Sequence, residues 1–269
     1  MEERARWVVA ASLAVGLAAG GLVGSAAAAP AASSVSAAPG QTALTVQASA
    51  GRDVYKPRKR FAREFTRRGD RDRSTSHIEH VRELQYRLRW AGVYNGPVTG
   101  TFAHRTYRAV KRFQRRHHLE VTGKANVRTW KKLIPKTVRG RGAIPPRCKR
   151  GRGWDICYDR KRHQVTLWKS GKLWNSWLVR GGSSSHPTRV GRFKVFYRDK
   201  DHVSSLYDSP MPHSQFFSGG QAFHGSALMM DPFVGHSHGC VNMYREDARQ
   251  LWQLTAKHPL KVRVYGAWD

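Results

Sequence analysis

Residues 236–243 of this 269-residue chain read His-Ser-His-Gly-Cys-Val-Asn-Met, and residues 223–226 read Phe-His-Gly-Ser. The longer stretch places a thiol, Cys240, directly after a glycine and two residues after a histidine. A thiol attacks acyl carbons as the thiolate, which forms when an imidazole takes the thiol proton. A glycine beside the nucleophile allows a sharp turn that directs backbone N–H groups at an oxyanion. These residue types together predict acyl transfer at Cys240.

Two histidines compete for the role of the base that activates Cys240. His224 precedes the thiol by 16 residues and lies on a separate predicted strand, from which it would reach Cys240 across a cleft. His238 is the alternative base, although residues so close in sequence rarely face one another. A zinc site of His236, His238 and Cys240 is a third interpretation, because alternate residues of a strand share a face. Gly239 disfavours a regular strand there, so we expect no metal.

The residues on both sides of this motif predict a mostly β domain over residues 154–269. Apolar and β-branched runs between turn residues are typical of strands, and apolar residues at three- and four-residue spacing are typical of a helix. The predicted elements are a hairpin (164–168 and 173–179 around a Ser170-Gly171 turn), strands at 193–197 and 221–224, a helix at 246–254 and a closing strand at 261–265.

Residues 81–133 show the spacing of short amphipathic helices instead. Turn residues separate three sets of apolar residues that recur at helical intervals: Val81, Leu84 and Leu88; Tyr107, Val110 and Phe113; Trp130 and Leu133. This pattern predicts a small three-helix bundle. The segment is strongly basic, because it holds 13 Lys or Arg and only two Glu. Such a charge favours a polyanionic partner.

This helical segment resembles a peptidoglycan-binding domain of the three-helix type. The matching residues are Gly92-Val-Tyr-Asn-Gly-Pro-Val-Thr-Gly100, Ala109-Val-Lys-Arg-Phe-Gln114, Val121-Thr-Gly123 and Thr129-Trp130. The sequence departs from the family at Thr99, where Asp is usual, and at Ala103, where Gly is usual. The resemblance implies binding to the cell wall without assigning contact residues. The alternative is a helical docking module with another ligand.

Residues 154–269 resemble the L,D-transpeptidase catalytic domain of the YkuD type. That family carries a histidine, a spacer and the signature Ser/Thr-His-Gly-Cys-x-Asn, matched here by His224, twelve residues and Ser237-His-Gly-Cys-Val-Asn242. Its Thr-Pro-x-Gly-x-Phe motif corresponds to Thr188-Arg-Val-Gly-Arg-Phe193, with Arg in place of Pro. The resemblance implies a mostly β, sandwich-like fold with a short helix. The whole chain is then expected to be multidomain, with a three-helix bundle followed by this β domain.

The resemblance also implies a role for each residue of the motif. Cys240 would be the nucleophile and His224 the general base, with the carbonyl of Gly225 orienting the imidazole. The backbone N–H groups around Gly239 and Cys240 would form the oxyanion hole. The remaining motif residues would shape the loop and help to hold substrate: Ser237, His238 and Asn242.

The reaction that the resemblance implies is a two-step acyl transfer on the stem peptides and glycan of peptidoglycan. The thiol attacks the carbonyl of the third stem residue, a diamino acid, and the terminal D-Ala leaves. The side-chain amine of a second stem then takes the acyl group and forms a 3→3 cross-link, whereas attack by water would make the enzyme an L,D-carboxypeptidase. No cofactor or metal is required. A non-catalytic wall-binding protein is the other alternative, which the intact Ser-His-Gly-Cys segment disfavours.

The N-terminal segments predict export. Residues 7–29 are mostly Ala, Val, Leu and Gly, follow two arginines and end in small residues, so residues 1–29 are interpreted as a signal peptide. An uncleaved membrane anchor is the alternative, since this apolar run is long enough to span a bilayer. Residues 30–80 are expected to form a flexible, basic linker, and residues 134–153 a second basic linker.

Export also bears on the three cysteines. Cys148 and Cys157 are nine residues apart with glycines between them, which favours a small disulfide loop in an oxidising compartment. Cys240 is then left over, as a reactive thiol would be.

The charge of the whole chain narrows the class of partner. Lys and Arg total 48 against 18 Asp and Glu, a net charge of +30. Nucleic acid is the usual partner of so basic a chain, but export and the lack of a nucleic-acid motif argue against it. We expect anionic wall polymers instead, and a location that is secreted or in the cell wall. A membrane is a partner only if the signal peptide stays uncleaved.

Overall fold

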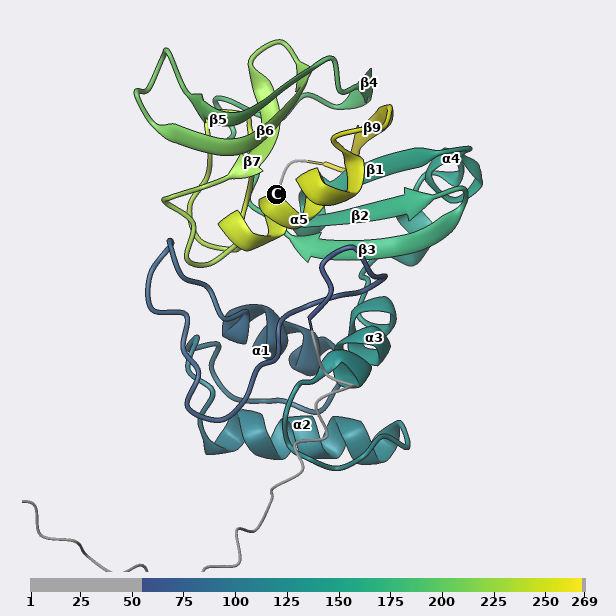
Figure 1. The fold of residues 1–269 in the computed structure, drawn as a ribbon, viewed down its shortest axis with the longest axis vertical. Coiled ribbons are helices and arrows are strands. Elements are labelled where there is room, and N and C mark those ends of the chain that lie inside the picture. The colour runs from purple at the N-terminus through teal and green to yellow at the C-terminus, as the bar shows by residue number, and fades with distance from the viewer. Residues whose placement is uncertain (1–54, 268–269) are drawn as a thin grey trace, which may run out of the picture. The chain divides into compact units, whose positions relative to one another are not determined.

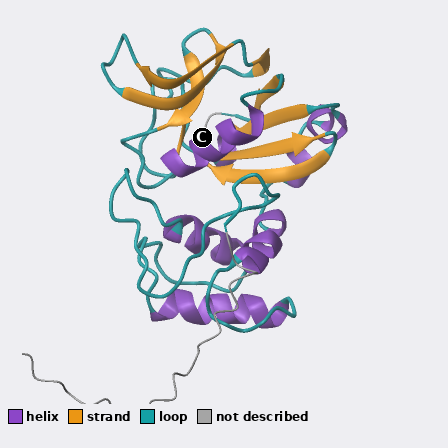
Figure 2. Ribbon diagram, in the orientation of Figure 1, coloured by secondary structure: helices purple, strands orange, loops and turns teal. Residues whose placement is uncertain are grey.

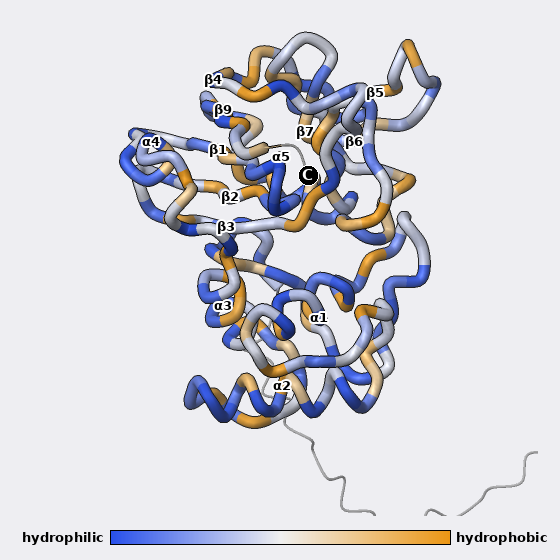
Figure 3. Tube along the Cα trace, turned by 180° about the vertical axis from the view of Figure 1, so that it is seen from behind, coloured by the Kyte–Doolittle hydropathy of each residue, from blue (hydrophilic) through white to orange (hydrophobic). Residues whose placement is uncertain are grey.

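Three amphipathic helices form the first domain of residues 55–267, the part of the chain that the computed structural model describes (Figure 1; Figure 2). They are α1 (Val81–Trp90), α2 (His104–Arg116) and α3 (Val127–Lys136). Their apolar faces meet in one core, which includes Leu84, Leu88, Val110, Phe113, Trp130 and Leu133. Along α2 the colour alternates between hydrophilic blue and hydrophobic orange, as expected of a helix with one buried face (Figure 3).

Helix α1 begins at Val81, the first residue of the predicted apolar spacing, but the residue before it does not cap the helix. His80, directly before the helix, has a left-handed φ of 55° and makes no side-chain cap. Asp72 takes that role, because its Oδ1 accepts from the Val81 N–H (3.1 Å) and its Oδ2 from the Arg82 N–H (2.7 Å). The carboxylate thus satisfies N–H groups that have no partner within the helix and lies at the positive end of its dipole.

The second domain consists of two sheets and a helix. The five-stranded sheet has the order β3-β2-β1-β9-β4 and the four-stranded sheet the order β5-β6-β7-β8. The strands are β1 (Trp154–Asp159), β2 (Gln164–Lys169), β3 (Lys172–Leu178), β4 (Gly191–Lys194), β5 (Tyr197–Val203), β6 (Pro210–Ser218), β7 (Gln221–Gly225), β8 (Val241–Met243) and β9 (Leu260–Tyr265). The predicted fold class, a helical domain followed by a mostly β domain, is confirmed. Between residues 55 and 267, no helix is long and apolar enough to span a membrane.

Both sheets contribute to one apolar core. Ile156 and Trp177 come from the first sheet, Phe223 and Val241 from the second, and Leu251 from helix α5 (Arg245–Thr255). Phe223 and Val241 are register partners on β7 and β8. Because successive residues of a strand point to opposite faces, their neighbours His224 and Asn242 lie on the face of the sheet turned away from this core.

Residues 55–80 differ from the flexible linker that the sequence predicts. Phe61 donates its N–H to the carbonyl of Trp174 on β3 (3.0 Å), and Thr66 pairs with Ala125 as an antiparallel bridge. Arg63 is only 1% exposed. Its order comes from polar contacts with residues far away in the chain, which a pattern of local hydropathy does not register. The rest of this predicted linker and the predicted signal peptide lie outside the described residues.

Residues 134–153 are likewise an ordered connection. They comprise the end of α3, a short 3-10 helix η1 (Arg141–Ala143) and helix α4 (Pro146–Arg150). Cys148 of α4 forms a disulfide with Cys157 of β1, and both residues are buried. The basic residues that suggested a solvated linker therefore belong to a short, cross-linked segment.

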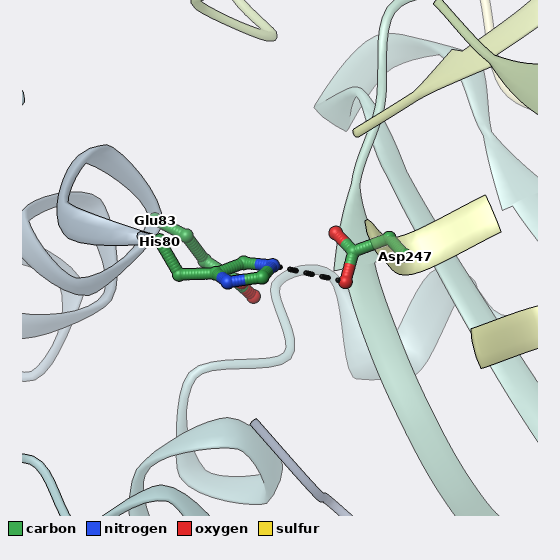
Figure 4. A group of neighbouring side chains, drawn as sticks. All are labelled: His80, Glu83 and Asp247. Carbon is green, nitrogen blue, oxygen red and sulfur yellow. Dashed lines mark hydrogen bonds and ion pairs between the residues drawn. The ribbon is translucent and has the colours of Figure 1, made fainter. Parts of the chain in front are cut away.

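A buried ion cluster joins the two domains. Glu83 of α1 accepts from Arg63 Nε (2.8 Å) and Nη2 (3.0 Å) and from Arg87 Nε (2.7 Å). Beside it, His80 Nε2 lies 3.2 Å from Oδ1 of Asp247 on α5 (Figure 4). Burial alone would lower the pKa of His80, but the charge of Asp247, its hydrogen bond to His80 and the charge of Glu83 together outweigh burial and raise the pKa to about 9. The imidazole is therefore a cation at neutral pH.

Three members of this cluster also offer metal-ligand atoms. The ligand atoms of His80, Glu83 and Asp247 lie within 4.8 Å of one another. Both oxygens of Glu83, however, already accept from guanidinium groups, and Arg63 Nε lies 3.7 Å from Asp247. A divalent cation would have to displace these bonds beside two positive charges, so the arrangement is that of an ion-pair cluster.

Candidate active site

Two adjacent strands bring the predicted base and nucleophile together. β7 and β8 pair in parallel with His224 opposite Asn242. Cys240 directly precedes β8, two residues before Asn242, and therefore points to the same face of the sheet as Asn242. Register partners share a face, so His224 points there too. The thiol and the imidazole are thus diagonal neighbours across the strand pair.

Arg180 extends this row of side chains beyond Asn242. The two residues exchange both backbone hydrogen bonds, at 3.0 and 2.8 Å. The Arg180 side chain is 8% exposed, and its Nη1 donates to the carbonyls of Leu228 (3.1 Å) and Val234 (3.3 Å). Burial lowers the pKa of Arg180. Within residues 55–267 no carboxylate forms an ion pair with Arg180, so its charge is uncompensated beside the imidazole.

The imidazole of His224 is buried and oriented by its own neighbour. Nδ1 lies 2.9 Å from the carbonyl oxygen of Gly225. A carbonyl only accepts, so Nδ1 carries the proton and Nε2 is left as the basic atom. Burial lowers the pKa of His224 to about 4, although the hydrogen bond with the Gly225 carbonyl favours the charged form. His224 is therefore neutral at physiological pH and able to accept a proton.

The thiol of Cys240 is also neutral at rest. It is partly buried, with Sγ 3.6 Å from the carbonyl oxygen of Gly220. Burial raises the pKa of the thiol. Since the pKa of His224 is lowered and that of Cys240 is raised, the favoured resting state is a neutral thiol beside a neutral imidazole.

The turn before Cys240 is held by Ser237. Its hydroxyl donates to the Cys240 carbonyl (2.6 Å) and accepts from the Gly239 N–H (3.1 Å). Ser237 is 9% exposed, and both hydrogen bonds of its hydroxyl lie within the turn. Its part in holding substrate stays a prediction. The Gly239 N–H is likewise taken within the turn. Gly239 has φ 115°, and a Cβ there would lie 2.4 Å from Gln221 Nε2.

His238 belongs to the rim of the site. Its exposed ring stacks on Tyr207, with centroids 4.4 Å apart and planes at 20°, and meets His186 edge-on at 5.4 Å. Asn242, in contrast, is buried and contacts His224. The structure therefore pairs His224 with Asn242 and places His238 among surface aromatic rings.

Comparison with known families gives a match for each of the two domains. Residues 154–264 match the family of L,D-transpeptidase catalytic domains known as YkuD, and residues 78–133 match a peptidoglycan-binding domain family. The chain joins a peptidoglycan-binding domain to an L,D-transpeptidase catalytic domain. The family resemblance predicted from the sequence is thus confirmed for both domains.

Individual relatives cover the chain unevenly. A spore cortex-lytic enzyme of Bacillus cereus is 42% identical over 59 residues, which are 22% of this chain and 23% of that protein. An L,D-transpeptidase structure from Stackebrandtia nassauensis is 23% identical, with a TM-score of 0.48 over 73% of this chain and 98% of that one. One from Xylanimonas cellulosilytica is 23% identical, with a TM-score of 0.42 over 76% and 98%. The chain therefore spans about a quarter of the length of the sequence relatives that it matches.

Two residues near the transpeptidase site were missed from the sequence. Gln221 accepts from the Arg189 N–H (2.9 Å) and donates to the Pro187 carbonyl (3.0 Å). It therefore connects residues 187–189 to the strand that carries His224. Arg180 was missed because it follows a predicted strand with no motif around it. Only the pairing of its backbone with Asn242 shows that the two residues are neighbours.

Proposed function

We propose that this chain is an extracytoplasmic cell-wall enzyme that forms 3→3 peptidoglycan cross-links through a thioester on Cys240. The observation that carries the proposal is the position of His224, whose Nδ1 bonds the Gly225 carbonyl and whose Nε2 is basic, on the strand beside the one that Cys240 precedes. An enzyme that acts on peptidoglycan works outside the cytoplasm. Export by residues 1–29 completes the proposal.

In the first half-reaction the donor stem acylates the enzyme. The thiol proton of Cys240 passes to Nε2 of His224 as Sγ attacks the carbonyl carbon of the third stem residue. The N–H of Cys240 donates to the developing oxyanion. The bond to the terminal D-Ala then breaks, and His224 returns the proton to the departing amine. A thioester on Cys240 and free D-Ala result.

In the second half-reaction an acceptor removes the acyl group. The side-chain amine of another stem loses a proton to His224 and attacks the thioester carbon, which forms an amide and returns the thiol. Water in place of the amine yields a tripeptide, the L,D-carboxypeptidase alternative. Asn242, bonded to His224, keeps the imidazole in place through both steps. No step uses a metal or a cofactor.

The test is mass spectrometry of the purified full-length chain with disaccharide-tetrapeptide, beside Cys240→Ala. We expect loss of D-Ala and a cross-linked dimer, both absent from the variant. Tripeptide without dimer would assign the carboxypeptidase activity. Absence of any Cys240-dependent product from folded protein would favour the non-catalytic wall-binding alternative.

The helical domain supports a proposal about the wall partner. Helix α2 carries six Lys or Arg and no acid, and Arg105, Arg108 and Arg112 line a cavity of about 700 Å³ with residues 92–95. The Arg112 side chain is bonded to the loop of residues 92–95, since its Nε and Nη2 both donate to the Val93 carbonyl (3.1 and 2.6 Å). An anionic wall polymer is the partner that fits this basic surface.

Binding to intact walls and to walls stripped of their anionic polymers tests this partner. We expect the full-length chain to bind intact walls more tightly, and Arg105→Gln with Arg108→Gln to remove most of that difference. Binding to intact walls should weaken with added salt, because screening acts on exposed charges. Equal, salt-independent binding to both wall preparations would contradict the proposal and leave peptidoglycan itself as the ligand.

A further inference from the structure

Residues 226–236 form the loop that connects the two halves of the catalytic pair. β7 ends one residue after His224, and β8 begins one residue after Cys240. A displacement of the loop therefore reaches the residues that flank the imidazole and the thiol. The contacts that hold this loop bear directly on how the two groups face each other.

From the catalytic domain, the loop is held through its backbone and through two of its side chains. The Phe233 ring lies 5.6 Å from the ring of His163, and Met229 packs with Tyr244. Arg180 Nη1 bonds the carbonyls of Leu228 and Val234, and the Tyr244 hydroxyl donates to the carbonyl of Met230 (3.2 Å). Inside the loop, the Asp231 carboxylate accepts from the Phe233 N–H (2.9 Å).

Two side chains of the loop, Asp231 and Phe233, are also held by helix α1 of the peptidoglycan-binding domain. The Tyr86 hydroxyl lies 3.0 Å from each carboxylate oxygen of Asp231, and Arg82 Nε lies 3.9 Å from the same carboxylate. The ring of Phe233 packs against Tyr86 (4.6 Å between centroids) and against Trp90 (6.0 Å, edge-on). Hydrogen bonding, charge and aromatic packing thus converge on two residues of the loop.

A further contact comes from the segment before α1. Ile78, Met229 and Tyr244 are each at most 1% exposed and form a small apolar cluster. Met229 lies in the loop and Ile78 in the segment that was expected to be a linker. The loop therefore contacts both the helical domain and the segment that precedes α1.

Two different stripes of helix α1 contact the loop and the ion cluster. Arg82, Tyr86 and Trp90 recur every fourth residue and form one stripe that faces the loop. Glu83 and Arg87 form the next stripe and belong to the ion cluster that joins the domains. The contacts between the Tyr86 stripe and residues 226–236 are therefore separate from the ion cluster that joins the domains.

We propose that α1 holds residues 226–236 in the position that keeps Cys240 within reach of His224, with Tyr86 acting through Asp231 as a positioning residue. This inference rests on the proposed function, because it gives the helical domain a part in the reaction besides wall binding. A small shift between reacting groups is enough for a large loss of rate, which makes a hydroxyl at the far side of the loop consequential.

The experiment uses the full-length chain with Tyr86→Phe, Asp231→Asn and the double variant. Tyr107→Phe is the matched control, because Tyr107 lies on α2 beside Gly123 and not on the stripe that faces the loop. We expect Tyr86→Phe to lower kcat on soluble tetrapeptide by about tenfold with KM nearly unchanged. The double variant should lose no more than the stronger single variant, since both remove one interaction.

A second measurement does not need the natural substrate. Cys148 and Cys157 are bonded, so Cys240 is the one cysteine that iodoacetamide reaches. Its alkylation rate measures how readily the thiol loses its proton with the help of His224. We expect slower alkylation and faster hydrogen exchange of residues 226–236 in Tyr86→Phe, at unchanged thermal stability. Unchanged alkylation and exchange would overturn the proposal. Failure of the wild-type chain to act on tetrapeptide would instead count against the proposed function, while alkylation and exchange still decide the role of Tyr86.

Discussion

Two buried histidines, one at the domain junction and one in the active site, have pKa values displaced in opposite directions. His80 is 2% exposed and His224 is 6% exposed. His80 faces the carboxylate of Asp247 and has a pKa of about 9, whereas His224 faces the carbonyl of Gly225 and has a pKa of about 4. Burial is the same in both places, so the facing group decides the charge. A full counter-charge makes a structural cation, and a carbonyl dipole leaves a neutral base.

The consequences for stability also run in opposite directions. The folded state holds a proton on His80 more tightly than the unfolded state does, so this contribution is complete below pH 6.5 and is lost as the pH rises through 9. The folded state disfavours a proton on His224, so stability falls as the pH drops from 6.5 towards 4. The fold is therefore most stable between these limits, as far as the two histidines determine it.

The largest expected effect tests the role of His224 as the neutral base in the comparison with His80. Replacing His224 by Gln removes the neutral base, and we expect kcat to fall by about 10²- to 10⁴-fold. Release of D-Ala from tetrapeptide measures it. His238→Gln serves as the comparison for the alternative base and should keep most of the activity. If His238→Gln lost as much as we expect of His224→Gln, and His224→Gln were active, the roles of the two histidines would be reversed.

The next effect removes the counter-charges at the domain junction. Glu83→Gln leaves Arg63 and Arg87 buried without their carboxylate, so we expect a loss of about 3–5 kcal/mol in the free energy of unfolding. Urea unfolding at pH 7 measures it. Glu120→Gln, an exposed position of the same domain, is the control and should change the free energy by less than about 0.5 kcal/mol.

A smaller effect isolates the proton on His80. Between pH 6 and pH 10 the wild-type chain should lose about 3 kcal/mol more than His80→Gln, because the pKa of His80 is about 9 when folded and 6.5 in its ordinary state. Urea unfolding of both chains at each pH gives this difference. Parallel pH dependence in the two chains would mean that Asp247 does not hold His80 as a cation.

The smallest expected effect is the absence of a change. Because the pKa of His224 is about 4, kcat/KM of the wild-type chain should stay nearly constant from pH 7 to pH 5.5 and decline only as the pH approaches 4. A pH profile with substrate below KM measures it. A decline centred near pH 6.5 would show that the base is not the buried, neutral imidazole of His224.

Local pattern was sufficient for most of the elements. The spacing of Leu84 and Leu88 and of Val110 and Phe113 predicts α1 and α2, and the Ser170-Gly171 turn predicts the hairpin of β2 and β3. The same reasoning failed for residues 55–80. Arg63 is ordered there by Glu83 and by the Ser176 carbonyl, 113 residues away, and no hydropathy pattern encodes such a contact.

The sequence predicted only the part of the site that lies in local motifs. Cys240, His224 and Gly225 lie in short motifs whose residue types announce their chemistry. Arg180 and Tyr86 carry no such mark, because they act on the loop of residues 226–236 from other parts of the chain. Ser237 lies in the same motif, and its hydroxyl bonds within the turn that the motif predicts.

The sequence by itself determined the two domain families and the thiol, because each depends on residues that are close together in the chain. The tertiary structure alone decided the protonation state of each histidine. His80 becomes a cation because the fold brings Asp247 to it from 167 residues away. His224 stays neutral because parallel pairing of β7 with β8 buries it beside Asn242 and leaves only a carbonyl dipole to face it.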